Sequence, residues 1–251
     1  MIRFLKILAM WIWWPFRRGA ARPLFIYAHP RSGSSLLMHI LADSPKIAGY
    51  GEYFIKYHSK LDYRLAEFDI RRKSGKLFKA VDYVANQVNH QSVTPNFGLV
   101  TRYTSCIFLF RQAHPTLSSM LELSDAKGMP MTPDDVANNY SVRLHDMMKQ
   151  ALVLSEDKKF ALTYEQLVDS PEAVLEALTA FLRLEEPLKT DYKTKGFTGK
   201  WGDISQHISK GVIVQTDSPL RNLDTSLLEY CNKNYQQALT HLKPYTAHVQ
   251  G

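Results

Sequence analysis

The sequence predicts an α/β fold in which a central parallel sheet is flanked by helices. Short apolar segments rich in aromatic and β-branched residues alternate with longer segments whose apolar residues recur at helical spacing. Residues 24–27 and 106–110 are apolar at consecutive positions, which is typical of parallel strands buried on both faces. The length of 251 residues suits a single domain of this kind.

The expected elements can be placed along the chain in order. A strand at 24–27 leads into an apolar helix that ends near Ser44-Pro45. Residues 52–90 are expected to be mostly helical, and within them 76–88 carry a helical stripe of valines and one leucine. Further strands are expected at 97–103, 106–110 and 160–163, and further helices from Pro115 and at 134–154, 171–182 and 223–242.

Residues 1–22 differ in composition from the rest of the chain. They contain three tryptophans, five basic residues and no acidic residue. Their longest uncharged run, residues 7–16, is shorter than the roughly 20 residues that span a bilayer. Tryptophans beside arginines favour a membrane interface, and the alternative is an arm packed on the domain or on a second subunit of a homodimer. We therefore divide the chain into an N-terminal arm, 1–22, and an α/β domain, 23–251.

The charge and the cysteines restrict the class of partner and the compartment. The net charge of +7 favours an anionic ligand or an anionic surface. The basic residues are dispersed and form no nucleic-acid-binding motif, so we expect no nucleic-acid partner. Cys106 and Cys231 lie too far apart to form a metal or redox motif, so no metal is expected. Two unpaired cysteines suit a cytoplasmic protein, peripheral at the membrane if the arm binds lipid.

A polar turn follows the first expected strand. Residues 30–35 read Pro-Arg-Ser-Gly-Ser-Ser and precede the apolar helix. The N–H groups of a first helical turn lack intrahelical partners and the helix dipole is positive there, so this is an anion site. Gly33 lets a ligand approach the backbone closely, and Arg31 adds a fixed charge. The turn lacks the lysine of the Walker pattern, so it is not a standard ATP or GTP site.

A second turn of the same kind follows the strand at 106–110. Arg111 comes directly after this strand, and Pro115 suits the first turn of the next helix. The carboxyl ends of parallel strands meet at one edge of a sheet, where ligands bind. Two neighbouring anion sites suit a ligand that carries two separated phosphates.

Four motifs in this order resemble those of sulfotransferases that use 3′-phosphoadenosine 5′-phosphosulfate (PAPS). Residues 30–37, PRSGSSLL, resemble the 5′-phosphosulfate loop, and residues 107–119, IFLFRQAHPTLSS, resemble the 3′-phosphate motif. Residues 161–182 resemble the strand and helix around a YEDL-type tyrosine, and residues 202–213 resemble the late loop over the nucleotide. The resemblance implies a P-loop-like domain that moves a sulfuryl group from PAPS to a hydroxyl or amine acceptor. The implied reaction forms 3′-phosphoadenosine 5′-phosphate (PAP) as its second product and requires no metal.

The resemblance also implies a role for individual residues. The 5′-phosphosulfate would be held by Arg31, Ser32, Gly33, Ser34 and Ser35. Arg111 and Ser119 would bind the 3′-phosphate, and Ser118 would restrain premature loss of the sulfuryl group. Tyr164 would flank the adenine, and the late loop would contribute Gly202, Lys210 and Gly211.

The catalytic base implied by the resemblance is Glu52. Gly51-Glu52 is similar to a GE dipeptide of the branch that includes the tyrosylprotein sulfotransferases, and we expect it where the first helix ends. Burial would raise the pKa of this carboxyl, whereas the alternative is a surface or salt-bridged glutamate. His29 is expected to be a neutral histidine hydrogen-bonded at a strand end rather than a catalytic group.

Several functional alternatives stay open at this point. The acceptor could be a carbohydrate, a lipid-linked molecule or a small alcohol. A second hypothesis is a nucleotide-dependent phosphotransferase on the same fold, although the Walker lysine that it needs is missing. A third is a non-catalytic nucleotide-binding protein at a membrane surface.

Overall fold

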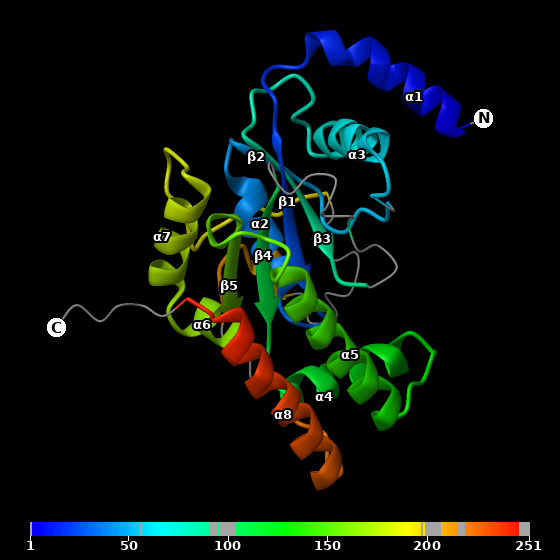
Figure 1. Ribbon diagram of the computed structural model, residues 1–251, viewed down its shortest axis with the longest axis vertical. Helices are drawn as coiled ribbons and strands as arrows, with labels where there is room; N and C mark the ends of the chain where they lie inside the picture. Colours follow the sequence, from blue (N-terminus) through cyan, green and yellow to red (C-terminus); the bar gives the residue numbers. More distant parts are fainter. Residues whose placement is uncertain are drawn as a thin grey trace, which may run out of the picture.

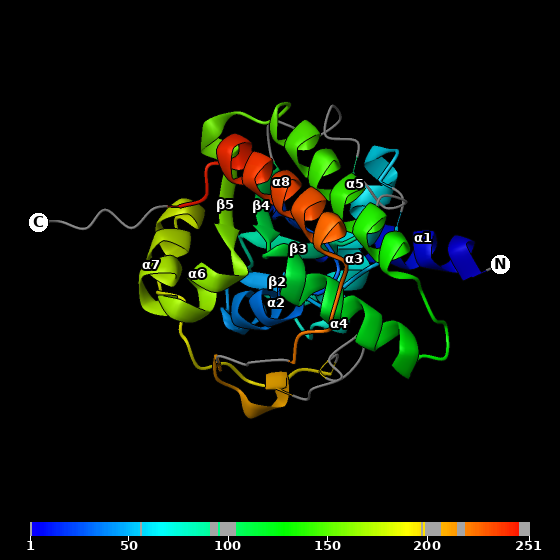
Figure 2. The ribbon, with the colours of Figure 1, turned by 90° about the horizontal axis from the view of Figure 1, so that it is seen from below.

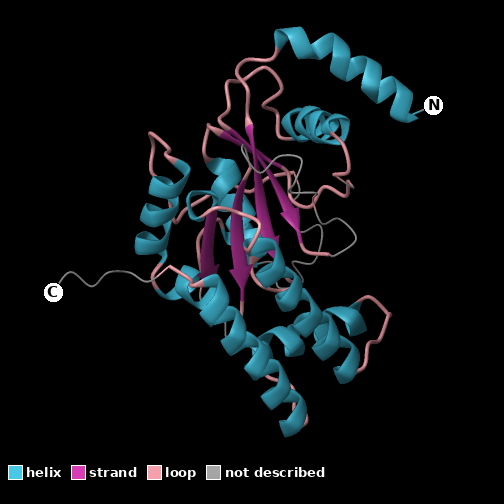
Figure 3. Ribbon diagram, in the orientation of Figure 1, coloured by secondary structure: helices cyan, strands magenta, loops and turns pink. Residues whose placement is uncertain are grey.

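The computed structural model describes residues 2–55, 57–90, 95, 104–196, 198, 207–214 and 219–245. A parallel five-stranded sheet in the order β2-β3-β1-β4-β5 forms its centre (Figure 1). The strands are β1 (Arg22–Ala28), β2 (Ile47–Gly49), β3 (Tyr83–Val88), β4 (Ser105–Phe110) and β5 (Lys159–Thr163). Their arrows run in one direction in Figure 3, which confirms the predicted parallel α/β fold.

Helices cover both faces of this sheet. Seen from the end in Figure 2, α5 and α8 lie across one face and α2 lies across the other. The α-helices are α1 (Ile2–Trp13), α2 (Ser34–Asp43), α3 (Lys60–Lys73), α4 (Ala113–Ala126), α5 (Pro133–Ala151), α6 (Tyr164–Asp169), α7 (Pro171–Leu182) and α8 (Thr225–Leu242). Most of these helices match the predicted ranges to within a few residues, and the short α6 was not expected.

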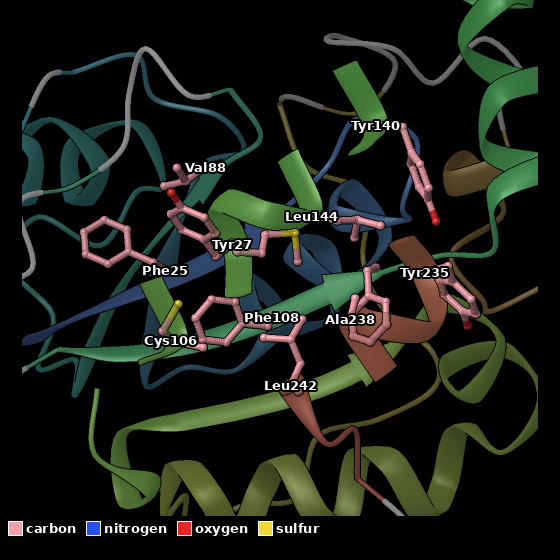
Figure 4. Close-up of a cluster of buried hydrophobic side chains, with 14 of the residues drawn as sticks. Phe25, Tyr27, Val88, Cys106, Phe108, Tyr140, Leu144, Tyr235, Ala238 and Leu242 are labelled. Atoms are coloured by element: carbon pink, nitrogen blue, oxygen red, sulfur yellow. The ribbon is translucent and has the colours of Figure 1, made fainter. Parts of the chain in front are cut away.

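The consecutive apolar residues of the central strands serve two cores. In β1, Phe25 and Tyr27 pack with α5 and α8, whereas Leu24 and Ile26 pack with α2 and α7. Figure 4 shows the first of these cores, where Phe108 of β4 lies beside Tyr27, facing helical side chains such as Leu144 and Ala238. Because alternate side chains of a strand point to opposite faces, a strand covered on both faces must be apolar throughout.

The prediction of a helix over residues 76–88 is wrong. Residues 83–88 form β3, which pairs with both β1 and β2, instead of the second half of a helix over 76–88. Its polar residues Asn86 and Gln87 are buried and hydrogen-bonded to the backbone of Tyr53 and Ser34. These polar residues interrupted the apolar run that would have indicated a buried strand. The strand expected at 97–103 lies outside the described residues.

The N-terminal arm is helical. Met10 and Trp13 of α1 are buried against Leu65 and Phe68 of α3, and the Trp13 indole N–H donates to the carbonyl of Leu77 at 2.9 Å. One face of the arm therefore packs on the domain, and the boundary at residue 22 stays a prediction. Within the described residues, the structure contains no helix with the length and apolar character that crossing a membrane requires.

Candidate functional site

The turn after β1 presents the N-terminus of α2. Arg31 has φ +65° and Gly33 has φ +88°, so the chain passes through left-handed backbone twice before α2 begins. Gly33 is the N-cap residue and contributes no side-chain oxygen to the first turn of the helix. The hydroxyl oxygen of Ser32 is buried and has no hydrogen-bond partner among the described residues. The turn therefore offers backbone N–H groups and an unsatisfied hydroxyl to an anion.

The turns after β1 and β4 lie side by side, as the strand order requires. Arg31 Nε donates to the hydroxyl oxygen of Ser119 in α4 at 2.8 Å. Arg111 Nη1 donates to the carbonyl of Arg31 at 3.4 Å, while Arg111 Nε is buried without a partner among the described residues. Because β1 and β4 are neighbours in the sheet, the prediction that the two anion turns meet is confirmed.

His29 connects the two turns. Its Nδ1 donates to the carbonyl of Pro30 at 2.8 Å, and its Nε2 accepts from the backbone N–H of Arg111 at 3.0 Å. Burial, helped by the charges of Arg143 and Arg111, lowers the pKa of this ring to about 4. His29 is therefore neutral at physiological pH, as the sequence predicted, and its role is to hold the turn after β4 against the turn after β1.

Tyr164, the first residue of α6, lies over both turns. The Arg111 guanidinium carbon is 4.2 Å from the centre of the Tyr164 ring. A Cβ atom on Gly33 would lie 2.5 Å from Cδ2 of the same ring. Two constraints therefore favour glycine at position 33: its positive φ, and the Tyr164 ring, which leaves no room for a Cβ atom.

Glu52 lies after β2 rather than directly after α2, because the short strand β2 separates them. Its side chain is buried, and Asn89 Nδ2 donates to Oε2 at 3.4 Å. The other oxygen, Oε1, is buried and has no hydrogen bond to the described residues, and His90 Nε2 stands 3.8 Å away. Burial raises the pKa of the Glu52 carboxyl, against smaller opposing effects from Asn89 and Arg143. The alternative of an exposed surface glutamate is therefore wrong.

The remaining predicted residues differ in their surroundings. Ser118 is buried, and its hydroxyl oxygen accepts from the backbone N–H of Arg221 at 3.1 Å. Gly211 has φ +73°, and its carbonyl accepts from the Tyr192 N–H at 2.7 Å. Lys210 ends the 3₁₀ helix His207–Lys210 and is exposed, and its side chain makes no hydrogen bond or ion pair with the described residues. Gly202 lies outside the described residues.

Sequence reasoning missed Arg143, a buried residue of α5. Arg143 Nε donates to the carbonyl of Ala28 at the end of β1 at 2.8 Å, and Nη2 donates to the carbonyl of Val88 at the end of β3. Its Nη1 pairs with Asp146 at 2.7 Å. The sequence does contain a signal for Arg143. It follows Tyr140 by three positions and precedes Met147 by four, which places it on the buried face of α5. A charge on an apolar stripe marks a buried, partnered group.

No metal-binding group stands beside these residues. Among the described residues, no cluster of histidine, cysteine, aspartate and glutamate side chains could hold a metal ion. The residues brought together are Arg31, Ser32, Gly33, Arg111 and Tyr164, which follow the carboxyl ends of strands, and Ser119 of α4. Glu52 occupies the equivalent position after β2.

Comparison with known proteins shows a family match over part of the chain and a shared fold over most of it. Residues 104–187 match the model of the sulfotransferase family. The chain is similar to the sulfotransferase domain of the Synechococcus PCC 7002 olefin synthase, with 16% identity, a TM-score of 0.52, and coverage of 86% of this chain and 95% of that one. It is also similar to the sulfotransferase domain from the curacin biosynthetic pathway, with 15% identity, a TM-score of 0.48, and coverage of 91% and 99%. A search of curated proteins found no match.

The matched segment contains the second half of the site. It includes Arg111, Ser118, Ser119 and Tyr164, whereas the turn at Arg31 precedes it. The olefin synthase domain shows that the fold is shared. The turn after β1 is bonded to the matched segment through Ser119, which joins the two parts into one site. Residues 104–187 therefore match the sulfotransferase family, and the chain as a whole shares the fold of a sulfotransferase domain.

Proposed function

We propose that this enzyme transfers the sulfuryl group of PAPS to a hydroxyl or amine of its acceptor. The observation that carries this proposal is the bond of 2.8 Å between Arg31 and Ser119, which joins two cationic turns at adjacent strand ends. In the same two turns, Ser32 Oγ and Arg111 Nε are buried and have no hydrogen-bond partner among the described residues. Leaving such atoms unsatisfied is costly, so they indicate a ligand with anionic oxygens at both turns.

Each turn would bind one end of the donor. The N-terminus of α2, from Gly33 to Ser35, would hold the 5′-phosphosulfate together with Arg31 and Ser32. Arg31 would stabilise the charge that grows on the bridging oxygen as the sulfur–oxygen bond breaks. Arg111 and Ser119 would hold the 3′-phosphate, and the ring of Tyr164 would pack on the adenine.

The four other donor-side residues have narrower roles in the proposal. The Ser118 hydroxyl would restrain sulfuryl loss before the acceptor arrives. Gly202, Lys210 and Gly211 would belong to the late loop that covers the nucleotide, with Lys210 adding a positive charge from the exposed 3₁₀ helix.

Glu52 would act as the general base. Its oxygen Oε1, which has no hydrogen bond to the described residues, would take the acceptor proton as the acceptor oxygen or nitrogen bonds to sulfur. The bond from sulfur to the bridging oxygen breaks in the same in-line transfer, and PAP leaves with that electron pair. Since burial raises the pKa of Glu52, the carboxylate is a stronger base here than on the surface.

Calorimetric titration and a turnover assay test this function. PAP should bind without a divalent metal, and PAPS should be consumed when an acceptor is present. The phosphotransferase alternative would instead give binding of ATP with Mg²⁺ and none of PAP, and that result would refute our proposal. PAP binding without any PAPS turnover across hydroxyl and amine acceptors would point to a nucleotide-binding protein that is not an enzyme.

A further inference from the structure

The helix α1 has a second apolar face that no other described part of the chain covers. Its inner face, with Met10 and Trp13, is buried against α3. The opposite face, which we call the outer face, consists of Phe4, Leu5, Leu8, Trp11 and Ile12, and each of these side chains is 50% exposed or more. Phe16, which follows in the 3₁₀ helix Trp14–Phe16, is 68% exposed and extends the apolar surface. A helix that is apolar on both sides is expected to have a second partner.

The rim of this surface is aromatic and cationic. Arg64 of α3 places its guanidinium 5.7 Å from the Trp11 ring and 4.9 Å from the Trp14 ring. Arg17 lies 3.6 Å from the centre of the Trp14 ring. Tryptophan and arginine side chains combine in this way where the apolar and polar layers of a membrane meet.

Charge distinguishes between the two candidate occupants. Residues 1–22 carry five basic residues and no acidic residue. Lys6 and Arg17 pair with Asp69 and Glu67 of α3, but the segment keeps an excess of positive charge, so two such segments brought together in a dimer would repel each other. An anionic lipid surface would attract them instead. A helix of 12 residues is too short to cross the hydrocarbon layer, but it can lie in the interface with its apolar face in the lipid.

We propose that the outer face of α1, with Phe16, docks the enzyme on a membrane surface that contains anionic lipid. The helix lies parallel to the surface, the outer face enters the boundary between headgroups and acyl chains, and the inner face keeps its packing on α3. This inference is independent of the proposed reaction, because it uses none of the residues assigned to the site.

Sedimentation with lipid vesicles tests the proposal. Full-length protein should bind vesicles of phosphatidylcholine with phosphatidylglycerol and should bind vesicles of phosphatidylcholine alone more weakly, with the difference reduced by salt. The double variant Leu8→Glu/Ile12→Glu should lower the vesicle partition coefficient by more than about tenfold. A matched control is Leu152→Glu/Val153→Glu, which makes the same charge change at two exposed apolar residues after α5 and should keep far more of the binding.

Measurements on the unaltered protein keep the test independent of variant folding. Brominated lipids should quench its tryptophan fluorescence in anionic vesicles, because Trp11 lies on the outer face. Absence of vesicle binding, or equal loss of binding in both double variants, would overturn the proposal. So would a concentration-dependent dimer in sedimentation velocity that Leu8→Glu/Ile12→Glu abolishes, since that result assigns the outer face to a second copy.

Discussion

Acidification should destabilise the protein through His29. The ring is fully buried, and its Nε2 must stay unprotonated to accept the backbone N–H of Arg111. Its pKa in the folded protein is lowered from 6.5 to about 4, chiefly by burial. The unfolded chain therefore binds a proton on His29 at a higher pH than the folded chain does.

The size of the effect follows from this difference in pKa. The contribution of His29 to stability is present above about pH 6.5 and is lost as the pH falls toward about 4. Between about pH 7.5 and about pH 5, the free energy of unfolding should decrease by about 2 kcal/mol on account of this ring. The full loss well below pH 4 would be about 3 kcal/mol.

Urea unfolding at both pH values measures this quantity when a variant serves as reference. In His29→Gln the amide can donate to Pro30 and accept from Arg111, but it does not titrate. The wild type should lose about 2 kcal/mol more than His29→Gln between the two pH values. His241→Gln, at an exposed histidine of α8, should behave like the wild type. Equal pH dependence in the wild type and His29→Gln would refute the reasoning.

Three further predictions concern the site itself. Glu52→Gln should lower kcat by about 100- to 10,000-fold and leave PAP affinity nearly unchanged. The wild-type kcat should fall as the pH drops through the raised pKa of Glu52. Retained turnover in Glu52→Gln would place the base elsewhere. Arg111→Ala should weaken PAP binding by about 10- to 100-fold in calorimetry with little effect on the 3′-dephospho analogue, and an equal loss for both would contradict its role. Gly33→Ala should destabilise the protein by more than about 1 kcal/mol in urea unfolding. The loss of unfolding free energy should exceed that of Gly128→Ala. At Gly128 φ is also positive, at +64°, but no atom stands within 4 Å of the added methyl group. Equal losses in the two variants would exclude the contact with Tyr164.

The parts of the fold that the sequence predicted well have local signals. The strand at 106–110 is apolar at every position, and it appears as Ser105–Phe110 in the structure. The turn at Arg31 combines a glycine, small polar residues and an apolar helix, all within one short segment. Such features need no knowledge of the rest of the chain, and the two anion turns could be placed beside each other from the parallel sheet alone.

The strand β3 could not be predicted because its polar residues have partners far away in the sequence. Asn86 Oδ1 accepts from the N–H of Tyr53 at 2.8 Å, and Gln87 donates to the carbonyl of Ser34 at 2.9 Å. A buried polar side chain is tolerated where such a bond satisfies it, but the pattern of a single strand does not reveal the bond. The surroundings of Glu52 were hidden for the same reason, since Asn89, which follows β3, is the donor to its carboxylate.

Arg143 explains how the two turns and Glu52 keep their relative positions. A buried guanidinium is costly unless its N–H groups are paired, and Arg143 pairs them with two strand ends and with Asp146. The carbonyl of Ala28 precedes His29, which holds the turn of Arg111, and the carbonyl of Val88 precedes Asn89, which binds Glu52. His29 and Asn89 therefore each directly follow a residue whose carbonyl is bound by the Arg143 guanidinium. Asp146 is fixed in turn by the Tyr27 hydroxyl at 2.6 Å, and the Tyr27 ring lies 4.0 Å below the guanidinium. Arg143 lies on the face of α5 whose apolar pattern indicates the core. Its role could not be predicted, because the two backbone carbonyls that it binds become neighbours only when the sheet forms.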